Sequence, residues 1–376
     1  MTRLRVGVVG AGLIGQVEHI PNLLALRDRF ELAGVADPSA TVRAAIGERH
    51  GVATYETLDA MLEDRLDALV VAVPDALHAD AVLTGLRAGL HVFCEKPLCF
   101  TQREAREIAE QRDAVGRIVQ VGYMKRFDPN YEAALELLPA DGRGLRYISV
   151  EVSDPDSWPF VGHRLLVRPD DVPAELVDDT RARQRAQAAE ALGAAVDGDD
   201  LRGYADPLMS GGVHAVNAIH GMLDAMGVPE GEVVAGQIWA HGEGGAGTVS
   251  LLDGQALWHV AQVLVPDIAW YRERHTLHFD DLVLELIFPA PYLNHQQTQL
   301  TVRRSDGRRL ETLHVEAGYE EAFVRELEWF HAAATGAAPA RNTVEEAARD
   351  SRVLTAIASK ALAATTGSDP NVAATA

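Results

Sequence analysis

The stretch Val9-Gly10-Ala11-Gly12-Leu13-Ile14-Gly15 lies between a short apolar run at 4–9 and a helical pattern that begins at residue 13. This order predicts a strand, a tight turn and a helix. The first glycine permits the turn, the second lets a pyrophosphate approach the backbone, and the third lets the helix pack close to the strand. The helix N-terminus would then offer N–H groups and a positive dipole end to the phosphates. We expect residues 10–15 to bind a dinucleotide; the alternative is a purely structural turn.

Asp37 supports the dinucleotide interpretation. It follows the next apolar run, 31–36, about 20 residues after the glycines, as a nucleotide-binding turn requires. An aspartate at this position can accept hydrogen bonds from the ribose hydroxyls, whereas a 2′-phosphate would meet a like charge. Pro38 and Ser39 bring no cation to offset that charge. We therefore expect NAD rather than NADP; the alternative is a solvated turn aspartate, which is common before proline.

The composition is typical of a water-soluble globular protein. The chain has 376 residues, and a domain usually takes about 100–200 residues, so two domains are expected. A formal net charge of −21 argues against nucleic acid and anionic membranes as partners. Because no apolar run is long enough to span a membrane and no signal-peptide pattern is present, we expect a cytoplasmic location. The only cysteines, Cys94 and Cys99, are expected to be structural rather than reactive or metal-binding.

The first third of the chain alternates short apolar runs with helical patterns, which predicts a parallel sheet covered by helices on both faces. In such a doubly wound Rossmann sheet the ligand binds at the carboxyl ends of the strands. We expect a Rossmann domain over residues 1–124. Its expected strands are 4–9, 31–36, 68–73, 90–94 and 118–121, and its expected helices are 13–28, 39–49, 57–64, 76–88 and 101–115.

The rest of the chain, 125–376, has a different pattern. Its apolar runs partly alternate and mostly lack helices between them, which favours an α+β domain with an open, mostly antiparallel sheet. If the uncovered face of this sheet is apolar it needs a partner, so we expect a homodimer or homotetramer formed through the open sheet. The runs are 144–152, 232–240, 246–252, 256–264, 275–288, 297–303 and 309–315, and helices are expected at 317–335 and 343–364.

A segment at about 153–206 interrupts this second domain. It contains an Arg- and Ala-rich helical pattern near 180–196. Long inserted segments are usually functional or mobile, so we expect this one to lie over the ligand cleft. Trp158, near its start, either lines a substrate pocket or packs the insertion onto the domain.

Two polar motifs follow expected strands and are candidates for substrate chemistry. Glu95-Lys96-Pro97 comes directly after the run at 90–94. A cation at this edge can polarise a substrate hydroxyl or carbonyl; the alternative is a surface Glu–Lys pair. Residues 122–131 carry Tyr123, Arg126 and a neighbouring lysine just past the next strand. They form either a substrate-facing loop or a linker with a solvated Lys–Arg pair.

A third motif is a helix that follows Gly211-Gly212. Asn217 and His220 are three residues apart and share a face of this helix, whereas His214 lies on another face. Histidine suits general acid–base catalysis, although a single helical histidine is more often structural. No metal site is expected, because six residues is a poor spacing for two histidine ligands on one helix.

Together these motifs resemble the Gfo/Idh/MocA family, the group of glucose-fructose oxidoreductase and inositol dehydrogenase. The resemblance covers nearly the whole chain and rests on 10–15, Asp37, 95–97, 122–129 and 211–220. It implies an N-terminal Rossmann domain and a C-terminal domain with an open, mostly antiparallel sheet. It also implies NAD(P)-dependent oxidation or reduction of sugars, cyclitols and related polyols.

The resemblance further implies roles for individual residues. Lys96 matches the family's catalytic lysine, and His220, eight residues after the last glycine of the Gly-Gly turn, matches its catalytic histidine. Many polyol dehydrogenases of the family carry an aspartate four residues before that histidine. Val216 stands there in this chain. Asn217 cannot simply replace the aspartate, and His214 is a possible substitute.

The resemblance also extends the expected cofactor contacts beyond the glycines and Asp37. Pro74 and His78 match a Pro-Asn-x-x-His segment near the cofactor, with Asp75 in place of the asparagine. Glu95 and Lys96 complete this group.

Our hypothesis is an NAD-dependent oxidoreductase that acts by hydride transfer on a secondary alcohol of a sugar, aminosugar or cyclitol. Lys96 polarises the reacting oxygen and His220 accepts its proton. The other expected substrate contacts are Tyr123, Arg126, Trp158, His214 and Asn217. The alternatives are an NAD-retaining epimerase, eliminase or glycosidase, a non-catalytic NAD-binding sensor, and an NADPH-linked reductase of a non-sugar carbonyl.

Overall fold

The structure is a computed structural model that describes residues 2–365. The chain forms two compact units, each discontinuous in sequence. Among the described residues, the first unit combines 2–124 with 158–187 and 322–349, and the second combines 125–157, 188–321 and 350–365. The domain limits given above, 1–124 and 125–376, stay a prediction about independently folding domains, as does the extent of the insertion.

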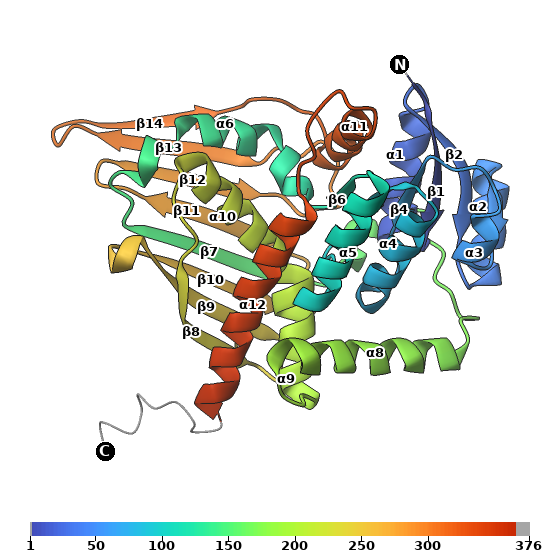
Figure 1. The fold of residues 1–376 in the computed structure, drawn as a ribbon. Helices are drawn as coiled ribbons and strands as arrows, with labels where there is room; N and C mark the ends of the chain where they lie inside the picture. The colour runs from blue at the N-terminus through green and yellow to red at the C-terminus, as the bar shows by residue number, and fades with distance from the viewer. Residues whose placement is uncertain (1, 366–376) are drawn as a thin grey trace. The chain divides into compact units, whose positions relative to one another are not determined.

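The first unit contains a six-stranded sheet in the order β3-β2-β1-β4-β5-β6, in which every neighbouring pair is parallel (Figure 1). The strand order reverses between β1 and β4, which places a switch point beside the glycine-rich turn. The Rossmann prediction is confirmed. The strands are β1 Leu4–Val9, β2 Phe30–Ala36, β3 Ala53–Tyr55, β4 Ala68–Val71, β5 His91–Cys94 and β6 Val119–Val121. Strand β3 was not predicted, because three partly exposed residues leave no apolar run.

Helices cover both faces of this sheet. On one face, Val8 of β1 lies in a core cluster with Leu23, Ile46 and Phe330 from three helices. On the other face Gly85 packs closely on Leu69. The helices of the first unit are α1 Ile20–Ala25, α2 Ala40–His50, α3 Leu58–Met61, α4 His78–Arg87, α5 Gln102–Val115, α7 Trp158–Val161 and α11 Ala322–Ala334.

The helix expected at 13–28 is interrupted. A π-helical turn occupies Gly15–His19, and α1 follows from Ile20 to Ala25. Pro21 lacks a backbone N–H, so it cannot form the α-helical hydrogen bond to the carbonyl of Val17. The chain is helical from residue 13 to 25, which confirms a helix here, but the π-helical turn within it was not predicted. The helix expected near 180–196 instead runs from Ala174 to Leu192 as α8, after a proline that favours a helix start.

The second unit contains an eight-stranded sheet in the order β14-β13-β12-β11-β7-β10-β9-β8. Only the pair β7 and β10 is parallel, which confirms the mostly antiparallel sheet. The run expected at 275–288 is two strands, because a short turn separates β11 from β12. The strands are β7 Tyr147–Asp154, β8 Glu232–Trp239, β9 Gly244–Leu251, β10 Ala256–Leu264, β11 Arg272–His278, β12 Leu282–Phe288, β13 Gln299–Ser305 and β14 Leu310–Val315.

Helices α10 (Val213–Met226) and α12 (Val344–Thr365) lie along one face of this sheet in Figure 1. Residues alternate between buried and more exposed along β7 and β10, with Tyr147 and Leu257 among the exposed apolar side chains. Alternation of this kind is expected when helices cover only one face of a sheet. The remaining helices of the second unit are α6 Pro129–Leu137 and α9 Gly198–Gly203.

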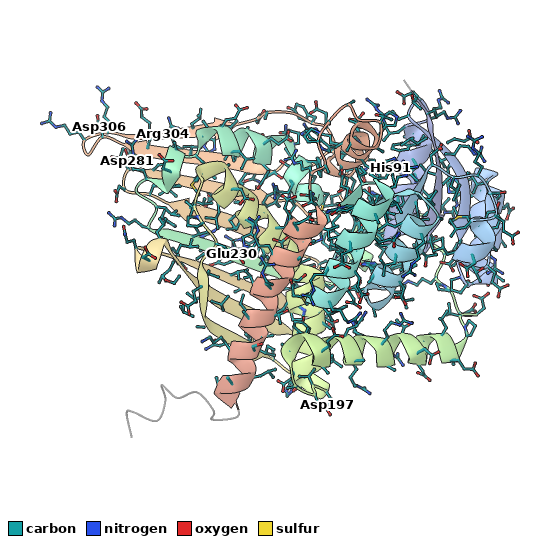
Figure 2. The ribbon with its side chains drawn as sticks, in the orientation of Figure 1. His91, Asp197, Glu230, Asp281, Arg304 and Asp306 are labelled. Carbon is teal, nitrogen blue, oxygen red and sulfur yellow. The ribbon has the colours of Figure 1, made fainter. Side chains whose placement is uncertain are left out.

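Asp306 closes the β13–β14 hairpin, at whose tip it is labelled in Figure 2. One carboxylate oxygen accepts hydrogen bonds from the backbone N–H groups of Arg308 and Arg309, each at 2.8 Å. These two backbone hydrogen bonds hold the pKa of the Asp306 carboxyl below its usual range. The turn is thus fixed by its own side chain. Within residues 2–365, no helix is long and apolar enough to cross a membrane.

The close approach of α12 to the second sheet depends on two glycines. A Cβ atom at Gly236 of β8 would lie 1.9 Å from the carbonyl oxygen of Ile357, and one at Gly247 of β9 would lie 2.3 Å from the Ile357 side chain. We therefore expect Gly236→Ala to lower the free energy of unfolding by about 1–3 kcal/mol through overpacking. Thermal and urea unfolding measure this loss.

Gly47→Ala in α2 is the control for this prediction. Its Cβ atom would make only ordinary contacts at 3.7 Å. A helical Gly→Ala exchange is favourable by about 0.5–1 kcal/mol. Equal stability of the two variants would contradict the close packing of α12.

Candidate functional site

The glycine-rich turn is packed at two glycines and open at the third. At Gly10, φ is +88°, and a Cβ atom would lie 2.3 Å from the carbonyl oxygen of Ala72. A Cβ atom at Gly15 would lie 2.6 Å from the carbonyl oxygen of Gly10, whereas one at Gly12 would meet nothing within 4 Å. The protein itself therefore requires glycine at positions 10 and 15 only. The open position 12 fits a close-lying pyrophosphate, while Leu13 and Ile14, both half-buried, begin the helix.

Asp37 is held in place beside this turn. Its Oδ2 accepts a hydrogen bond from the backbone N–H of Ala11 at 2.8 Å, and its Oδ1 accepts one from that of Ser39 at 2.9 Å. Asp37 is half-buried and is not a freely solvated turn residue. A carboxylate fixed at the end of β2 fits recognition of the adenosine ribose.

The loops after β4 and β5 are tied together by His78. Its Nδ1 lies 2.6 Å from the carbonyl oxygen of Pro97, and its Nε2 lies 2.8 Å from that of Val73. Pro74 begins the short helical turn that leads to His78. The peptide bond between Lys96 and Pro97 is cis. His78 thus acts as a brace between the switch-point loop and the turn that carries Lys96.

Glu95 also stabilises the turn that carries Lys96. Its Oε1 lies 2.8 Å from Nε2 of the buried His19, and its Oε2 accepts a hydrogen bond from the backbone N–H of Lys96 at 3.2 Å. Burial would raise the pKa of the Glu95 carboxyl, but the hydrogen bond and charge of His19, with the charge of Lys96, hold it below its ordinary value. Glu95 is buried and Lys96 half-buried, so these residues are not a surface Glu–Lys pair.

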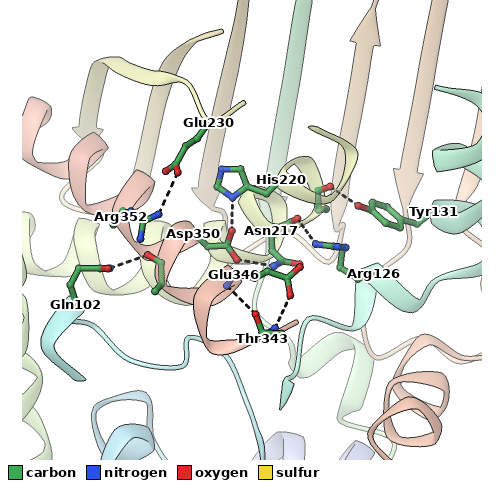
Figure 3. Close-up of polar contacts among 12 residues, drawn as sticks. Gln102, Arg126, Tyr131, Asn217, His220, Glu230, Thr343, Glu346, Asp350 and Arg352 are labelled. Atoms are coloured by element: carbon green, nitrogen blue, oxygen red, sulfur yellow. Dashed lines mark hydrogen bonds and ion pairs between the residues drawn. The ribbon is translucent and has the colours of Figure 1, made fainter. Parts of the chain in front are cut away.

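In the second unit, α10 and α12 form a buried polar cluster. Figure 3 shows the His220 ring and the Asn217 amide directed at the same carboxylate, that of Asp350. The distance from His220 Nδ1 to Asp350 Oδ1 is 2.5 Å, and Asn217 Nδ2 donates to Asp350 Oδ2 at 2.7 Å. None of the three side chains is more than 2% exposed. The edge of the His220 ring meets Trp258, with ring centroids 5.4 Å apart.

This geometry determines the tautomer of His220. A carboxylate only accepts hydrogen bonds, so Nδ1 must carry the proton that faces Asp350. In the neutral ring, Nε2 is then the nitrogen that can accept a proton. A histidine oriented by a buried carboxylate is the arrangement that general-base catalysis uses.

Sequence reasoning missed Asp350. The residue four before His220 is Val216, as noted above, and the carboxylate comes instead from a helix 130 residues further along the chain. A signal was present: Ala347, Asp350, Leu354 and Ile357 recur at helical spacing and are buried. An acidic residue in such a stripe is rarely buried without a partner.

The Lys125–Arg126 pair is buried rather than solvated, at 6% and 8% exposure, which excludes the solvated-pair alternative. Arg126 donates to the carbonyl oxygen of Asn217 at 3.4 Å and so lies along α10 (Figure 3). Tyr123 belongs to the first unit, is buried, and accepts a hydrogen bond at its carbonyl from Asn342 at 3.2 Å.

Lys125 joins a second buried cluster in the second unit. It donates to Glu273 Oε2 at 2.5 Å, and His275 Nε2 lies 2.8 Å from Glu273 Oε1. Tyr271 also donates to this carboxylate. Burial would raise the pKa of the Glu273 carboxyl, but the charge of Lys125 and the contact with His275 hold it well below its usual range. Lys125 therefore anchors its segment of the chain to Glu273.

The other predicted substrate contacts are placed differently. Trp158 lies in the first unit, is 45% exposed, and has the Arg168 guanidinium 4.2 Å from its ring centroid; this contact is internal to the insertion and decides neither alternative for Trp158. His214 is half-buried on α10. Both cysteines are reduced and buried, and burial raises the pKa of each thiol. Within residues 2–365, no group of three or more His, Cys, Asp or Glu side chains is arranged to hold a metal ion.

The fold and the turn define a Rossmann-fold dinucleotide-binding protein. Residues 4–123 match the model of the Gfo/Idh/MocA oxidoreductase family, described as having an NAD-binding Rossmann fold. The chain is 38% identical over 144 residues to an inositol 2-dehydrogenase of Rubrobacter xylanophilus, a match that covers 38% of this chain and 41% of that protein. The match thus spans less than half of the relative. Residues 4–123 therefore match the NAD-binding domain of the Gfo/Idh/MocA family, which confirms the resemblance noted from the sequence over this N-terminal region.

Solved structures extend the likeness of fold over both units. A 3-ketoreductase from Actinomadura kijaniata, in complex with NADP and TDP-benzene, superposes with a TM-score of 0.69 and 19% identity, covering 95% of this chain and 97% of that one. GenD2 from gentamicin A biosynthesis, in complex with NAD, gives a TM-score of 0.70 and 20% identity, covering 96% and 95%. At this level of identity the likeness shows the fold alone.

The open space at Gly12 leads to a prediction that separates binding from folding. Gly12→Ala should leave the thermal midpoint unchanged, because the added methyl group meets no protein atom. It should weaken NAD binding by at least about tenfold, because the methyl group occupies the approach of the pyrophosphate. Calorimetric titration with NAD measures the affinity.

Gly10→Ala is the contrasting variant. Its methyl group would collide with Ala72, and φ is unfavourable for alanine, so this variant should lose stability. Full NAD affinity in Gly12→Ala would contradict the placement of the pyrophosphate at the turn.

Proposed function

We propose that this protein is an NAD-dependent oxidoreductase that oxidises a secondary alcohol of a sugar, aminosugar or cyclitol. The observation that carries the proposal is the buried Asp350–His220 pair, in a chain whose other unit has the nucleotide turn of an NAD-binding Rossmann fold. The similarity to an inositol 2-dehydrogenase and to a 3-ketoreductase supports a polyol or sugar as the substrate class.

The residues around the turn fit the cofactor. Gly12 leaves room for a pyrophosphate, the N-terminus of the following helix would offer it N–H groups, and the Asp37 carboxylate would accept hydrogen bonds from the ribose. Pro74, His78 and Glu95 shape the two loops at the nicotinamide end. Bound NAD supplies the acceptor for the hydride that leaves the alcohol carbon.

The chain supplies the groups that handle the proton and the developing charge. The Lys96 ammonium donates a hydrogen bond to the reacting oxygen and stabilises its partial negative charge as the alcohol is oxidised. His220 accepts the hydroxyl proton at Nε2, and Asp350 stabilises the imidazolium that results. Asn217 and Arg126 orient neighbouring hydroxyls, and Tyr123, His214 and Trp158 are further candidates for substrate contacts.

The alternatives receive less support. A non-catalytic NAD sensor would need only the nucleotide-binding turn, and not the two candidate catalytic groups Lys96 and His220 in addition. No observation on the described residues favours net epimerisation, elimination or glycoside cleavage over oxidation. An NADPH-linked reductase is disfavoured by Asp37, which faces the position of the 2′-phosphate with a like charge.

We propose in addition a homodimer or homotetramer formed through the open face of the eight-stranded sheet. Exposed Tyr147 and Leu257 on neighbouring strands support an interface there. A cytoplasmic location is consistent with the two buried, unpaired cysteines. Sedimentation of the purified protein at several concentrations tests the assembly.

Lys96→Met tests the first catalytic role. Turnover should fall by on the order of 10² or more, because the developing alkoxide loses its cationic partner. NAD affinity should remain near normal. The assay is absorbance of reduced nicotinamide across a panel of polyols, glycosides and aminosugars with NAD and NADP. Wild-type turnover in Lys96→Met would overturn the assignment, and lack of turnover by the wild-type protein across a broad panel would favour the sensor.

Asp350→Asn tests the orientation of His220. The amide keeps the size of the side chain but loses the charge that stabilises the imidazolium, so kcat should fall by about 10²–10⁴. KM should change much less, and NAD affinity should not change, since Asp350 lies in the other unit. Asp59→Asn, which removes an exposed carboxylate, is the control and should have normal kcat. A loss confined to thermal stability, with kcat intact, would reduce Asp350 to a structural role.

A further inference from the structure

A short segment of the insertion, Arg164–Asp171, lies along the nucleotide-binding edge of the first unit. We call it the strap. Three residues of the strap form hydrogen bonds to the first unit: two to the π-helical turn after the glycines and one to the start of α2. The partners are about 130–150 positions earlier in the sequence. The contacts all lie within the first unit.

The middle of the strap is attached through Gln16. The Gln16 amide donates to the carbonyl oxygen of Val167 at 2.9 Å, and its carbonyl accepts the backbone N–H of Val167 at 2.9 Å. The same amide group also donates to the carbonyl oxygen of Ala11 at 2.7 Å, inside the glycine-rich turn. Gln16 therefore connects the strap directly to the backbone of the nucleotide turn.

The first end of the strap is attached through Arg164. Its guanidinium donates to the carbonyl oxygen of Val17 at 3.0 Å. This carbonyl is the one that Pro21 cannot satisfy, as described above, because proline has no N–H. The interruption of the first helix thus creates the acceptor for the strap.

The far end of the strap brings a carboxylate to the start of α2. Asp171 Oδ1 accepts from the Ser39 hydroxyl at 2.5 Å, and Oδ2 accepts from the backbone N–H of Thr41 at 2.9 Å and from its hydroxyl at 3.1 Å. The hydrogen bonds from Ser39 and Thr41 lower the pKa of the Asp171 carboxyl to about 2, so it is ionised at neutral pH.

The position of this carboxylate is informative because of Asp37. Ser39 donates its backbone N–H to Asp37 and its hydroxyl to Asp171, so one residue links the two carboxylates. Asp37 is placed to bind the ribose hydroxyls, and a 2′-phosphate on that ribose would extend toward the residues that follow β2. Two hydroxyls and a helix N-terminus would suit a phosphate. The Asp171 carboxylate already accepts hydrogen bonds from these donors.

Arg43, a nearby cation that would compensate for these negative charges, is also engaged. Arg43 donates through Nη1 to the carbonyl oxygens of Asp37 and Pro38, at 2.7 and 2.9 Å. The Arg43 guanidinium thereby binds the loop after β2 and not the Asp171 carboxylate. A phosphate entering here would have to displace an ionised side chain and meet a second one, which is discrimination by a repulsive element.

We propose that Asp171 is a specificity-determining residue that occupies the position of the 2′-phosphate and so excludes NADP. The inference rests on the proposed NAD-dependent function and adds to it a residue from outside the Rossmann sheet. The strap keeps Asp171 in place through Gln16 and Arg164. The ribose hydroxyls of NAD remain accessible to Asp37, whereas the phosphate of NADP competes directly with the Asp171 carboxylate.

The test compares Asp171→Asn with Asp170→Asn in the full-length protein. Both changes remove one negative charge at adjacent positions, and Asp170 is exposed. Dissociation constants for NAD and NADP are measured by calorimetry. The NAD-over-NADP preference should fall by at least about tenfold in Asp171→Asn, through tighter NADP binding, and should stay within about twofold of wild type in Asp170→Asn.

A second pair of ligands isolates the phosphate. Adenosine 2′,5′-bisphosphate should gain affinity for Asp171→Asn, and 5′-AMP should not. Asp171→Ala should behave like Asp171→Asn, since either change removes the charge. An unchanged preference, or equal weakening of both cofactors, would overturn the role of Asp171. Failure of the wild-type protein to bind either dinucleotide would instead overturn the proposed function itself.

Discussion

The close approach of the glycine-rich turn to β4 is the constraint on which the first unit depends. The backbone at Gly10 lies so near Ala72 that no side chain fits, and Gly15 lies equally close to the carbonyl of Gly10. These contacts fix the direction of the chain as it leaves β1 and enters the helix. Because Asp37 hydrogen-bonds the same turn, the end of β2 is fixed as well. One packed turn thus positions both the phosphate-facing and the ribose-facing groups.

Both units contain buried carboxylates paired with histidines, and two of these pairs serve different ends. In the pair Glu95–His19, the Glu95 carboxylate contacts the His19 ring and also accepts a hydrogen bond from the backbone N–H of Lys96. The pair Asp350–His220 instead leaves the far nitrogen of the ring for proton transfer. Burying a carboxylate is costly unless it is hydrogen-bonded and paired, so neither partner can be removed without leaving an unpaired polar group. The first pair shapes a loop, and the second orients the histidine that we propose as the base.

Much of the fold was predictable because it depends on local patterns. Unbroken apolar runs gave the parallel strands, alternating runs gave most of the antiparallel ones, and the glycine spacing marked the switch point. The errors also have local causes. Strand β3 is too short to produce a run, Pro21 interrupts the first helix, and the run at 275–288 contains a turn. The candidate residues of the first unit were selected because they follow strands, where ligand-facing groups collect.

The supporting carboxylates were not predictable in this way, and the reason is physical. Asp350 and Asp171 act through residues more than 100 positions distant, on a helix and on an inserted strap. A motif records the groups that face the ligand, since turn geometry fixes their spacing. The groups that orient them need only be close in space, so their sequence positions are unconstrained. Val216 illustrates the consequence: the absence of a carboxylate at one position in the sequence does not mean its absence from the site, because another helix supplies it.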